Sequence, residues 1–509
     1  AGQVPPALLS SVRIAAAAEP ATASAGNGNN TTIGNKPPAP PVGPPTAAPT
    51  PPPTTAPTPP APAPGPGPAP TPAPTAAPVP KPPAPAPTPA PVPTPPPKIL
   101  KPSLVESDNL AFVGSRAAHA QRMVAELAGG DAALAARLTV APGVEIRSPG
   151  RLSLESEWNL VPASGSRVGE AMRLSLRAGG DLALLNSLSD GFAAARSATD
   201  KRAIAANGVA MAGRAASFRL VAGADLAAAD PMALNEAADA TKATGSLVIG
   251  RPGSSATATP PIVFIRSTTG SIAMAAAGDI NLGVALNAQG RNGQVRIYTT
   301  GEALPTPSTQ DLNRLGLRLS DQLIPNSPSG NLGPFFDHAG AISLQAGRDV
   351  LSLPGYKYPS GGGQPQSVQY VADWWWRQLS PNAQQLGLMF WSRYDQFAQG
   401  IASFGGGDIA VRAGRDLVDL ELSTPASGYR LREQGLPGGK DYVPGAGTWM
   451  PGGSLRASAG RDVLGGLYNA GGAQASLSAG SRIGGGSGRA LSYAAPQLFH
   501  LDTRWSVQA

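Results

Sequence analysis

Six aspartates recur at one position of a repeated phrase, and their side chains are the first candidates for chemistry. In each copy, alternating apolar residues lead into Ala-Gly-x-Asp or a close variant. A row of carboxylates would suit calcium, and two carboxylates facing each other across a cleft would suit hydrolysis of a polysaccharide. The repeated acids are Asp181, Asp225, Asp279, Asp349, Asp416 and Asp462.

The sequence around these acids favours a structural role at turns over calcium binding. Calcium solenoids carry the acid in a nine-residue repeat, whereas here it comes once in a much longer unit. In three late copies an arginine directly precedes the acid (Arg348, Arg415 and Arg461), and it would relieve repulsion between stacked carboxylates. Glycine accepts positive φ, and aspartate bonds its own backbone two residues on. We therefore expect each phrase to form a tight turn.

The remaining polar residues show no recognised catalytic or metal-binding pattern. The acids repeat as part of the scaffold, so no glycosidase pair stands out, and His119, His338 and His500 are scattered. Cysteine is absent, as are a nucleophile elbow and a phosphate-binding loop. We therefore expect no catalytic residue, no cofactor and no metal site. A β-helical polysaccharide-degrading enzyme remains an alternative, because that fold also hosts such enzymes.

A cluster of aromatic residues in the segment 373–404 is the second candidate site, and it contains four of the seven tryptophans. The stretches 373–377 and 386–398 have the spacing of two short helices. If exposed, their aromatic side chains would form a binding surface for a glycan or a protein. The alternative is that they pack on the flank of the main fold. The candidate partner-binding residues are Trp374, Trp375, Trp376, Trp391 and Tyr394.

The repeated phrase also predicts the elements that position these residues. Alternating apolar residues such as Leu174 and Leu176 indicate a strand with one buried face. Successive acids are 44, 54, 70, 67 and 46 residues apart, and a last copy with Arg482 follows after 20. We interpret these intervals as multiples of a coil of roughly 20–23 residues, with skipped coils at Glu145 and Glu302. The prediction is an all-β fold, a right-handed parallel β-helix, because the uneven intervals exclude a propeller.

Composition divides the chain into four parts. Proline, alanine and threonine dominate one long segment, which predicts a disordered polyproline II spacer. The expected parts are a low-complexity segment 1–36 with a possible frayed strand at 11–14, the Pro-rich linker 37–102, a helical cap 103–137, and a β-helix 138–509 with insertions near 303–337 and 356–404.

The charge pattern argues against nucleic-acid binding, and the distribution of apolar residues argues against a transmembrane helix. The net charge is +7, but the arginines are dispersed along the repeats, often beside an aspartate, and no basic run exists. We therefore expect no nucleic-acid binding. The sequence has no apolar stretch of about 18 residues or more, so we expect no transmembrane helix.

Several phrases together resemble one protein family. The stretches 142–146 (PGVEI), 187–192 (SLSDGF), 218–225 (FRLVAGAD) and 374–377 (WWWR), with the Ala-Gly-Arg-Asp copies, are similar to the filamentous haemagglutinin family of bacterial exoproteins. The resemblance covers roughly 138–509. It implies a right-handed β-helix that an outer-membrane two-partner secretion transporter exports, secreted or displayed at the bacterial cell surface and typically active in adhesion.

The sequence departs from a complete family member at its amino terminus. It has no secretion domain with the Asn-Pro-Asn signature, and Ala1 is preceded by neither Met nor a signal peptide. We therefore expect a fragment of a large adhesin-like exoprotein. Its role would be that of a structural rod that presents loops to a glycan or protein receptor on host or neighbouring cells. A stalk of a surface signalling or contact-dependent toxin system is a further alternative.

Overall fold

The computed structural model forms two compact units, residues 17–93 and residues 1–16 with 94–509, and every described residue belongs to the second. The described residues are 12–14, 97–103, 120–140, 143–161, 171–193, 208–235, 244–253, 262–284, 293–305, 307–314, 316–317, 335–353, 371, 374–379, 387–394, 396–397, 399–431, 448–485, 495–501 and 503–509. The predicted Pro-rich linker therefore lies outside the described residues as far as residue 96.

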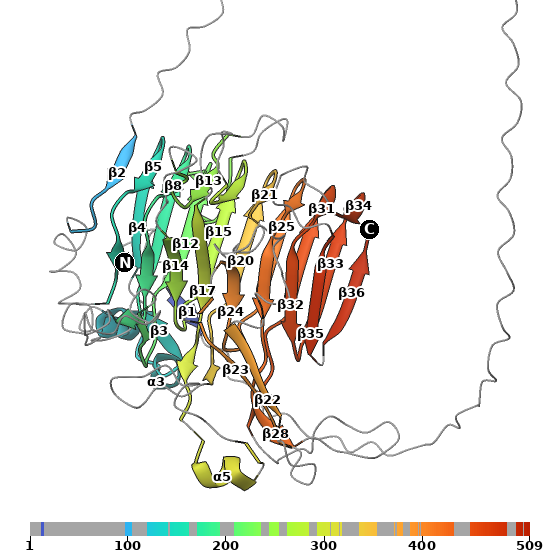
Figure 1. Cartoon of the computed structure of the whole chain (residues 1–509). Helices are drawn as coiled ribbons and strands as arrows, with labels where there is room; N and C mark the ends of the chain where they lie inside the picture. Colours follow the sequence, from blue (N-terminus) through green and yellow to red (C-terminus); the bar gives the residue numbers. More distant parts are fainter. Residues whose placement is uncertain are drawn as a thin grey trace, which may run out of the picture. The chain divides into compact units, whose positions relative to one another are not determined.

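The chain folds as a parallel β-helix with three stacked sheets, as the repeat predicts (Figure 1). Each coil contributes one strand to each sheet, and all neighbours within these sheets are parallel. Sheet 1 contains β4 (Gly143–Ser148), β7 (Arg173–Ala178), β12 (Ser217–Ala222), β15 (Ile272–Ala276), β20 (Ile342–Ala346), β25 (Ile409–Ala413), β30 (Leu455–Ala459), β33 (Gln474–Ala479) and β36 (Arg504–Gln508).

The strands of the other two sheets are shorter on average. Sheet 2 contains β2 (Lys98–Leu100), β5 (Leu152–Leu154), β8 (Leu182–Leu184), β13 (Leu247–Ile249), β16 (Ile280–Leu282), β21 (Val350–Leu351), β26 (Leu417–Val418), β31 (Asp462–Leu464) and β34 (Arg482–Gly484). Sheet 3 contains β6 (Trp158–Asn159), β9 (Leu188–Asp190), β14 (Ile262–Ser267), β17 (Gln294–Thr299), β24 (Gly400–Ser403), β27 (Glu421–Thr424), β32 (Leu467–Gly471) and β35 (Gln497–Leu501).

Consecutive copies of the repeated phrase lie on adjacent coils, so the coil predicted at Glu302 is wrong, whereas the coil predicted before the first full copy is present and contains β4. Phe218 pairs with Ile272, which pairs with Ile342, although 54 and 70 residues separate them along the chain. Glu145 lies inside β4, opposite Ser175. Glu302 lies in the short strand β18 (Glu302–Ala303), which follows the sheet 3 strand β17 along the chain. The long intervals are single coils enlarged by excursions.

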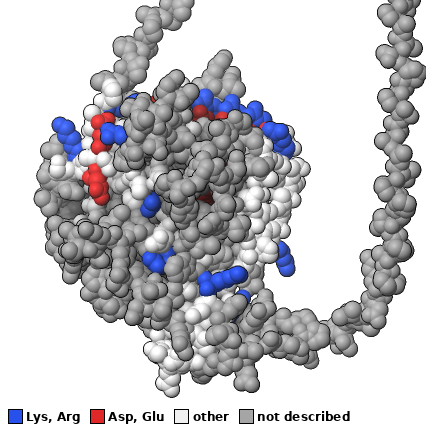
Figure 2. Space-filling model, viewed as in Figure 1, with Lys and Arg blue, Asp and Glu red and all other residues white. Residues whose placement is uncertain are grey.

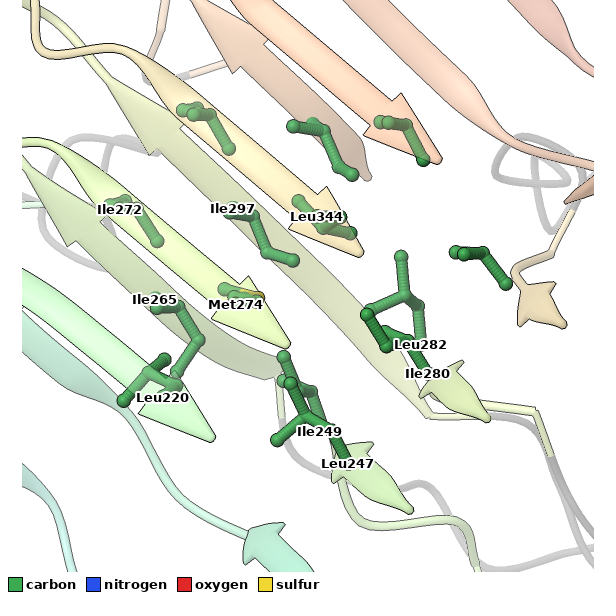
Figure 3. Packing of buried hydrophobic residues seen from close by; sticks show 14 of the residues in the cluster. Leu220, Leu247, Ile249, Ile265, Ile272, Met274, Ile280, Leu282, Ile297 and Leu344 are labelled. Atoms are coloured by element: carbon green, nitrogen blue, oxygen red, sulfur yellow. The ribbon is translucent and has the colours of Figure 1, made fainter. Parts of the chain in front are cut away.

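Alternation along the strands directs apolar side chains into one continuous core between the three sheets. Leu220, Met274 and Leu344 stack on one another from sheet 1, and Ile265 faces them from sheet 3 (Figure 3). All four side chains are at most 2% exposed. Full burial of such a side chain stabilises the fold by about 1.5–3 kcal/mol, so this core accounts for the regular stacking of the coils.

In most copies the glycine of the repeated phrase is required by close stacking of the backbone, and the predicted positive φ is wrong. Among the phrase glycines only Gly223 has a positive φ, of 65°. A Cβ on Gly347, Gly414 or Gly460 would lie 2.1 Å from a carbonyl oxygen of the preceding coil. Ala277 takes this position in the coil after Gly223. Glycine therefore allows neighbouring turns to stack without a side chain between them.

Two excursions from successive coils build a separate antiparallel sheet, which we call the lateral sheet (Figure 1). Its strands are β22 (Trp375–Leu379), β23 (Gly387–Ser392), β28 (Ser427–Leu431) and β29 (Trp449–Met450), in that order. Of the two helices predicted at 373–377 and 386–398, only Trp374 is helical among the described residues, and strands β22 and β23 take the place of most of the rest. Aromatic residues favour strands, and pairing with β28 from a distant part of the sequence decides the outcome.

Other segments differ from the predicted boundaries in detail. Strand β2 lies inside the predicted linker and begins sheet 2. The predicted cap 103–137 contains helical residues 120–128 and α3 (Ala132–Ala135) among those described. The possible frayed strand is β1 (Val12–Ile14), which pairs antiparallel with β3 (Leu138–Val140).

Two further excursions begin with short antiparallel pairs. Strands β10 (Phe192–Ala193) and β11 (Val209–Ala210) form one such pair. In the insertion predicted at 303–337, β18 pairs with β19 (Phe336–Asp337), and α5 (Thr309–Arg314) lies between them in the chain. The insertion predicted at 356–404 ends earlier, because β24 is part of sheet 3.

Candidate functional site

Five of the six repeated acids, all except Asp225, lie at the turn between sheets 1 and 2, directly before or at the start of a sheet 2 strand. Backbone hydrogen bonds stack this position from coil to coil, since Ile280 N–H donates to Asp349 O and Val350 N–H donates to Asp416 O. The residues in this column are Asp181, Ser246, Asp279, Asp349, Asp416, Asp462 and Arg482.

In the later coils each acid binds the arginine of the next coil. Arg348 donates from Nε and Nη2 to the two carboxylate oxygens of Asp279, at 3.1 and 2.7 Å. Arg415 binds Asp349 in the same two-pronged way, with 2.9 Å from Nε to Oδ1. Arg461 repeats the arrangement on Asp416, with 2.8 Å from Nε. We call this series the arginine–aspartate ladder.

A backbone hydrogen bond completes each step of the ladder. Asp349 N–H donates to Asp279 Oδ1 at 3.1 Å, and Asp416 N–H donates to Asp349 Oδ1 at 3.1 Å. Each carboxylate therefore accepts three hydrogen bonds from the following coil, two of them from a guanidinium group. Such bidentate pairs are among the stronger and more directional hydrogen bonds, so the ladder holds neighbouring coils in register.

Asp181 and Asp225 depart from the ladder. Asp181 Oδ1 accepts a hydrogen bond from Ser246 N–H at 2.8 Å. Asp225 Oδ1 accepts from Ala227 N–H at 2.9 Å and starts an excursion, and the chain returns to the column at Ser246. Asp225 thus makes the Asx turn expected from the sequence. Ser246 is the residue that sequence reasoning missed, because it carries no part of the repeated phrase.

The ladder leaves little scope for metal chemistry at these acids. Within the part of the chain that the structure describes, no group of three or more His, Cys, Asp or Glu side chains could hold a metal ion. The carboxylates of Asp279, Asp349 and Asp416 each face a guanidinium group. These residue types and distances fit ion pairs that join coils.

We expect the protein to become less stable at acidic pH because the Asp349 carboxylate becomes protonated. Burial by itself raises the pKa of Asp349, but hydrogen bonds from Arg415 and from the Asp416 amide outweigh it, and the pKa is lower than usual. A lowered pKa means that the ionised acid stabilises the folded state above the unfolded pKa of about 3.9, and this contribution is lost as pH falls through the folded value. We expect the free energy of unfolding to decrease below about pH 4.

Asp349→Asn provides the control for this acid sensitivity. The variant should be less stable than the wild type at pH 7, because Asn offers Arg415 no charged partner. The difference between the two proteins should shrink as the pH falls toward the folded pKa. Denaturant unfolding at several pH values measures this difference, and a difference that is constant from neutral to strongly acidic pH would exclude the assigned role.

The ladder is incomplete at its carboxyl-terminal end. The last copy reads Ser481-Arg482, so Arg482 occupies the acid position and its Nε lies 3.5 Å from Asp462 Oδ2. Asp462 Oδ1 is buried and has no hydrogen-bond partner among the described residues. Ser481 stands where earlier coils carry the donating arginine, so its substitution can supply the missing hydrogen bonds.

We expect Ser481→Arg to raise the free energy of unfolding by about 0.5–1 kcal/mol, since it adds a two-pronged partner for Asp462. Ser481→Lys is the matched control, because lysine carries the same charge without the planar fork and should gain less. Chemical denaturation measures both variants. Equal stability of Ser481→Arg and Ser481→Lys would show that net charge, and not the ladder geometry, sets the effect.

The second candidate site is mostly buried. Trp374, Trp391 and Tyr394 are 0%, 2% and 4% exposed, and Trp375 is half-buried. The side chain of Trp376 lies outside the described set. Trp374 sits edge-on to Phe404, with 5.6 Å between ring centroids, and Phe404 directly follows the sheet 3 strand β24. This burial supports packing on the flank of the β-helix, the alternative to an exposed binding surface.

A buried arginine lies beside the same aromatic layer on the outer face of sheet 3. The guanidinium carbon of Arg266 lies 4.4 Å from the centroid of the Phe192 ring, and its Nη1 donates to Tyr298 Oη at 2.9 Å. Tyr394 Oη accepts from Ala210 N–H at 3.1 Å and so ties the insertion to another excursion. The sequence carries no local signal for this cluster, because its members lie on neighbouring coils but are far apart in the sequence.

The lateral sheet places its aromatic residues on two faces. Met389 and Trp391 pack against the α5 insertion through Leu312 and Phe335. On the opposite face, Trp375 and Trp449 lie beside Phe390, with centroid distances of 5.4 and 5.9 Å. The insertions therefore form a joint accessory module supported by sheet 3.

Together the three sheets and the ladder define a β-solenoid protein. Comparison of the chain with protein-family models, with curated proteins and with solved structures gave no match. Over the described part of the chain, the helices are too short or too polar to cross a membrane.

Proposed function

We propose that the chain is the structural solenoid of a secreted or surface-displayed bacterial adhesin-like exoprotein, similar to the filamentous haemagglutinins. The arginine–aspartate ladder carries this proposal. In the ladder, Asp279, Asp349 and Asp416 each form an ion pair with an arginine of the next coil. A protein in which three of the repeated acids join neighbouring coils is suited to a mechanical role, in which a rod holds other surfaces away from its point of attachment.

The placement of the excursions supports the same proposal. They leave the solenoid at its turns, and two of them form the lateral sheet. The core remains continuous beneath them, from Leu100 to Leu477. Loops on a rigid scaffold commonly carry binding functions. A glycan or protein receptor on host or neighbouring cells is the proposed partner, and an outer-membrane two-partner secretion transporter is the proposed exporter of the complete polypeptide.

An attachment assay tests this proposal. Beads coated with the chain are incubated with epithelial cells and with bacterial cells, and bound beads are counted. Beads that carry the same chain after denaturation serve as the matched control, because their composition is identical. We expect folded chains to increase attachment to at least one cell type. Equal counts for folded and denatured coatings on both cell types would contradict the adhesive role.

A further inference from the structure

The outer face of sheet 1 changes character along the β-helix. In the early coils an excursion covers it, and Val221 and Ala275 are 0% and 2% exposed beneath Leu226 and Met232. From β20 onward the outward positions are open, and β20 and β25 alternate between buried and exposed residues. The outward side chains of Gln345 and Arg412 belong to this open part.

The open part of sheet 1 is polar and basic. We define the open face as strands β20, β25, β30, β33 and β36 with the three residues that follow each of the first four. Its charged residues are Arg348, Arg412, Arg415, Arg456, Arg461, Arg482, Arg504, Asp349, Asp416 and Asp462. Arg412, Arg456 and Arg504 are exposed and form no ion pair with any described residue. The face therefore keeps a positive charge after the ladder is neutralised.

The ladder borders this face and adds donors to it. The side chains of Arg415, Arg461 and Arg482 are 40%, 53% and 62% exposed. Arg415 and Arg461 use Nε and Nη2 for the ladder, so each Nη1 remains available to a ligand. Figure 2 shows the resulting row of basic residues, with few acidic ones, along one edge of the later coils. Adjacent coils repeat about every 4.8 Å, so the donors form a regular series.

We infer that the open face binds a linear acidic polysaccharide that lies across the strands. Arginines supply the charge, and Ser343, Ser458 and Ser476 supply hydroxyl groups between them. No outward position of the face carries an aromatic side chain, which argues against single-stranded nucleic acid, whose bases stack on aromatic rings. Carboxylate and sulfate groups share the required chemistry.

This inference names the chemical class of the receptor that the proposed adhesive function requires, and so it rests on that proposed function. Binding is nevertheless measured on the purified full chain, without cells, so that the two can fail separately. Titration calorimetry uses polygalacturonate as the carboxylated probe, dextran sulfate as the sulfated probe, and neutral dextran and an oligothymidine as comparisons. We expect binding of at least one acidic polysaccharide, weakened by salt because exposed charges are screened.

The triple variant Arg412→Gln, Arg456→Gln, Arg504→Gln removes the three exposed charges and leaves the ladder intact. We expect its affinity to fall about tenfold or more, as three exposed charge contacts are lost. The matched variant Arg137→Gln, Arg251→Gln, Arg377→Gln removes three exposed charges elsewhere and should bind within about twofold of the wild type. Circular dichroism confirms that both variants fold.

Four outcomes would overturn the inference. They are the absence of binding to both acidic polysaccharides, equal binding of neutral dextran, tighter binding of the oligothymidine, and an equal loss of affinity in the two triple variants. Preference for polygalacturonate or for dextran sulfate identifies the carboxylated or the sulfated class. Acidic polysaccharide binding without attachment to cells would retain the inference and reject the adhesive role.

Discussion

Gly414→Ala is expected to destabilise the β-helix by about 3 kcal/mol. A Cβ at this position would lie 2.1 Å from Gly347 O and 2.9 Å from the carbonyl carbon of the same residue. Both contacts are with backbone, which cannot rotate away as a side chain would. The Gly414 N–H donates to Ala346 O at 2.9 Å, so relief of the clash requires the two coils to separate at the turn. Equilibrium unfolding in guanidinium chloride, followed by circular dichroism, measures the loss.

Gly484→Ala is the matched control for this prediction. A Cβ on Gly484 would meet nothing within 4 Å, and its φ is not positive. Its stability should therefore remain within about 0.5 kcal/mol of the wild type. A similar loss in both variants would show that the close backbone contact at Gly414 does not set the cost, and it would contradict the role assigned to close stacking.

The architecture was predictable because the residues that form it repeat. Alternation such as Leu174-Ser-Leu176 before a turn identifies sheet 1, and the recurrence of that pattern requires stacked coils. The number of coils was not predictable from the intervals. Strand β21 contains only Val350 and Leu351, and such a short element leaves no periodic signal in the sequence. Excursions of any length can therefore separate two adjacent coils.

The ladder and the aromatic cluster were also predictable only in part from the sequence. Arg415 beside Asp416 suggested charge compensation, but Arg415 binds Asp349 of the preceding coil, which only the register reveals. The aromatic stretch was recognised as an insertion. Its fold depends on pairing between Phe390 and Gly428, and its burial depends on residues such as Tyr298, which lies on the neighbouring coil but far away in the sequence. Contacts of this kind depend on the three-dimensional arrangement and leave no local pattern.

Trp374→Ala is expected to lower the free energy of unfolding by about 3–5 kcal/mol. Trp374 is fully buried, and its ring lies 5.4 Å from Phe397 and 5.6 Å from Phe404, both nearly perpendicular to it. Truncation would leave a large cavity between the insertion and the outer side of sheet 3. Thermal and denaturant unfolding measure the cost, and tryptophan fluorescence reports on the cluster itself.

Trp374→Phe separates packing from partner binding at this position. The indole Nε1 is buried and has no hydrogen-bond partner among the described residues, so phenylalanine loses no such bond there and retains an aromatic ring. Its cost should stay below about 1.5 kcal/mol. If Trp374 serves packing, the alanine variant loses stability while bead attachment below its unfolding transition is unchanged. Loss of attachment in a fully stable Trp374→Ala protein would instead assign this tryptophan to the binding surface. The burial of its ring against two phenylalanines favours the first result.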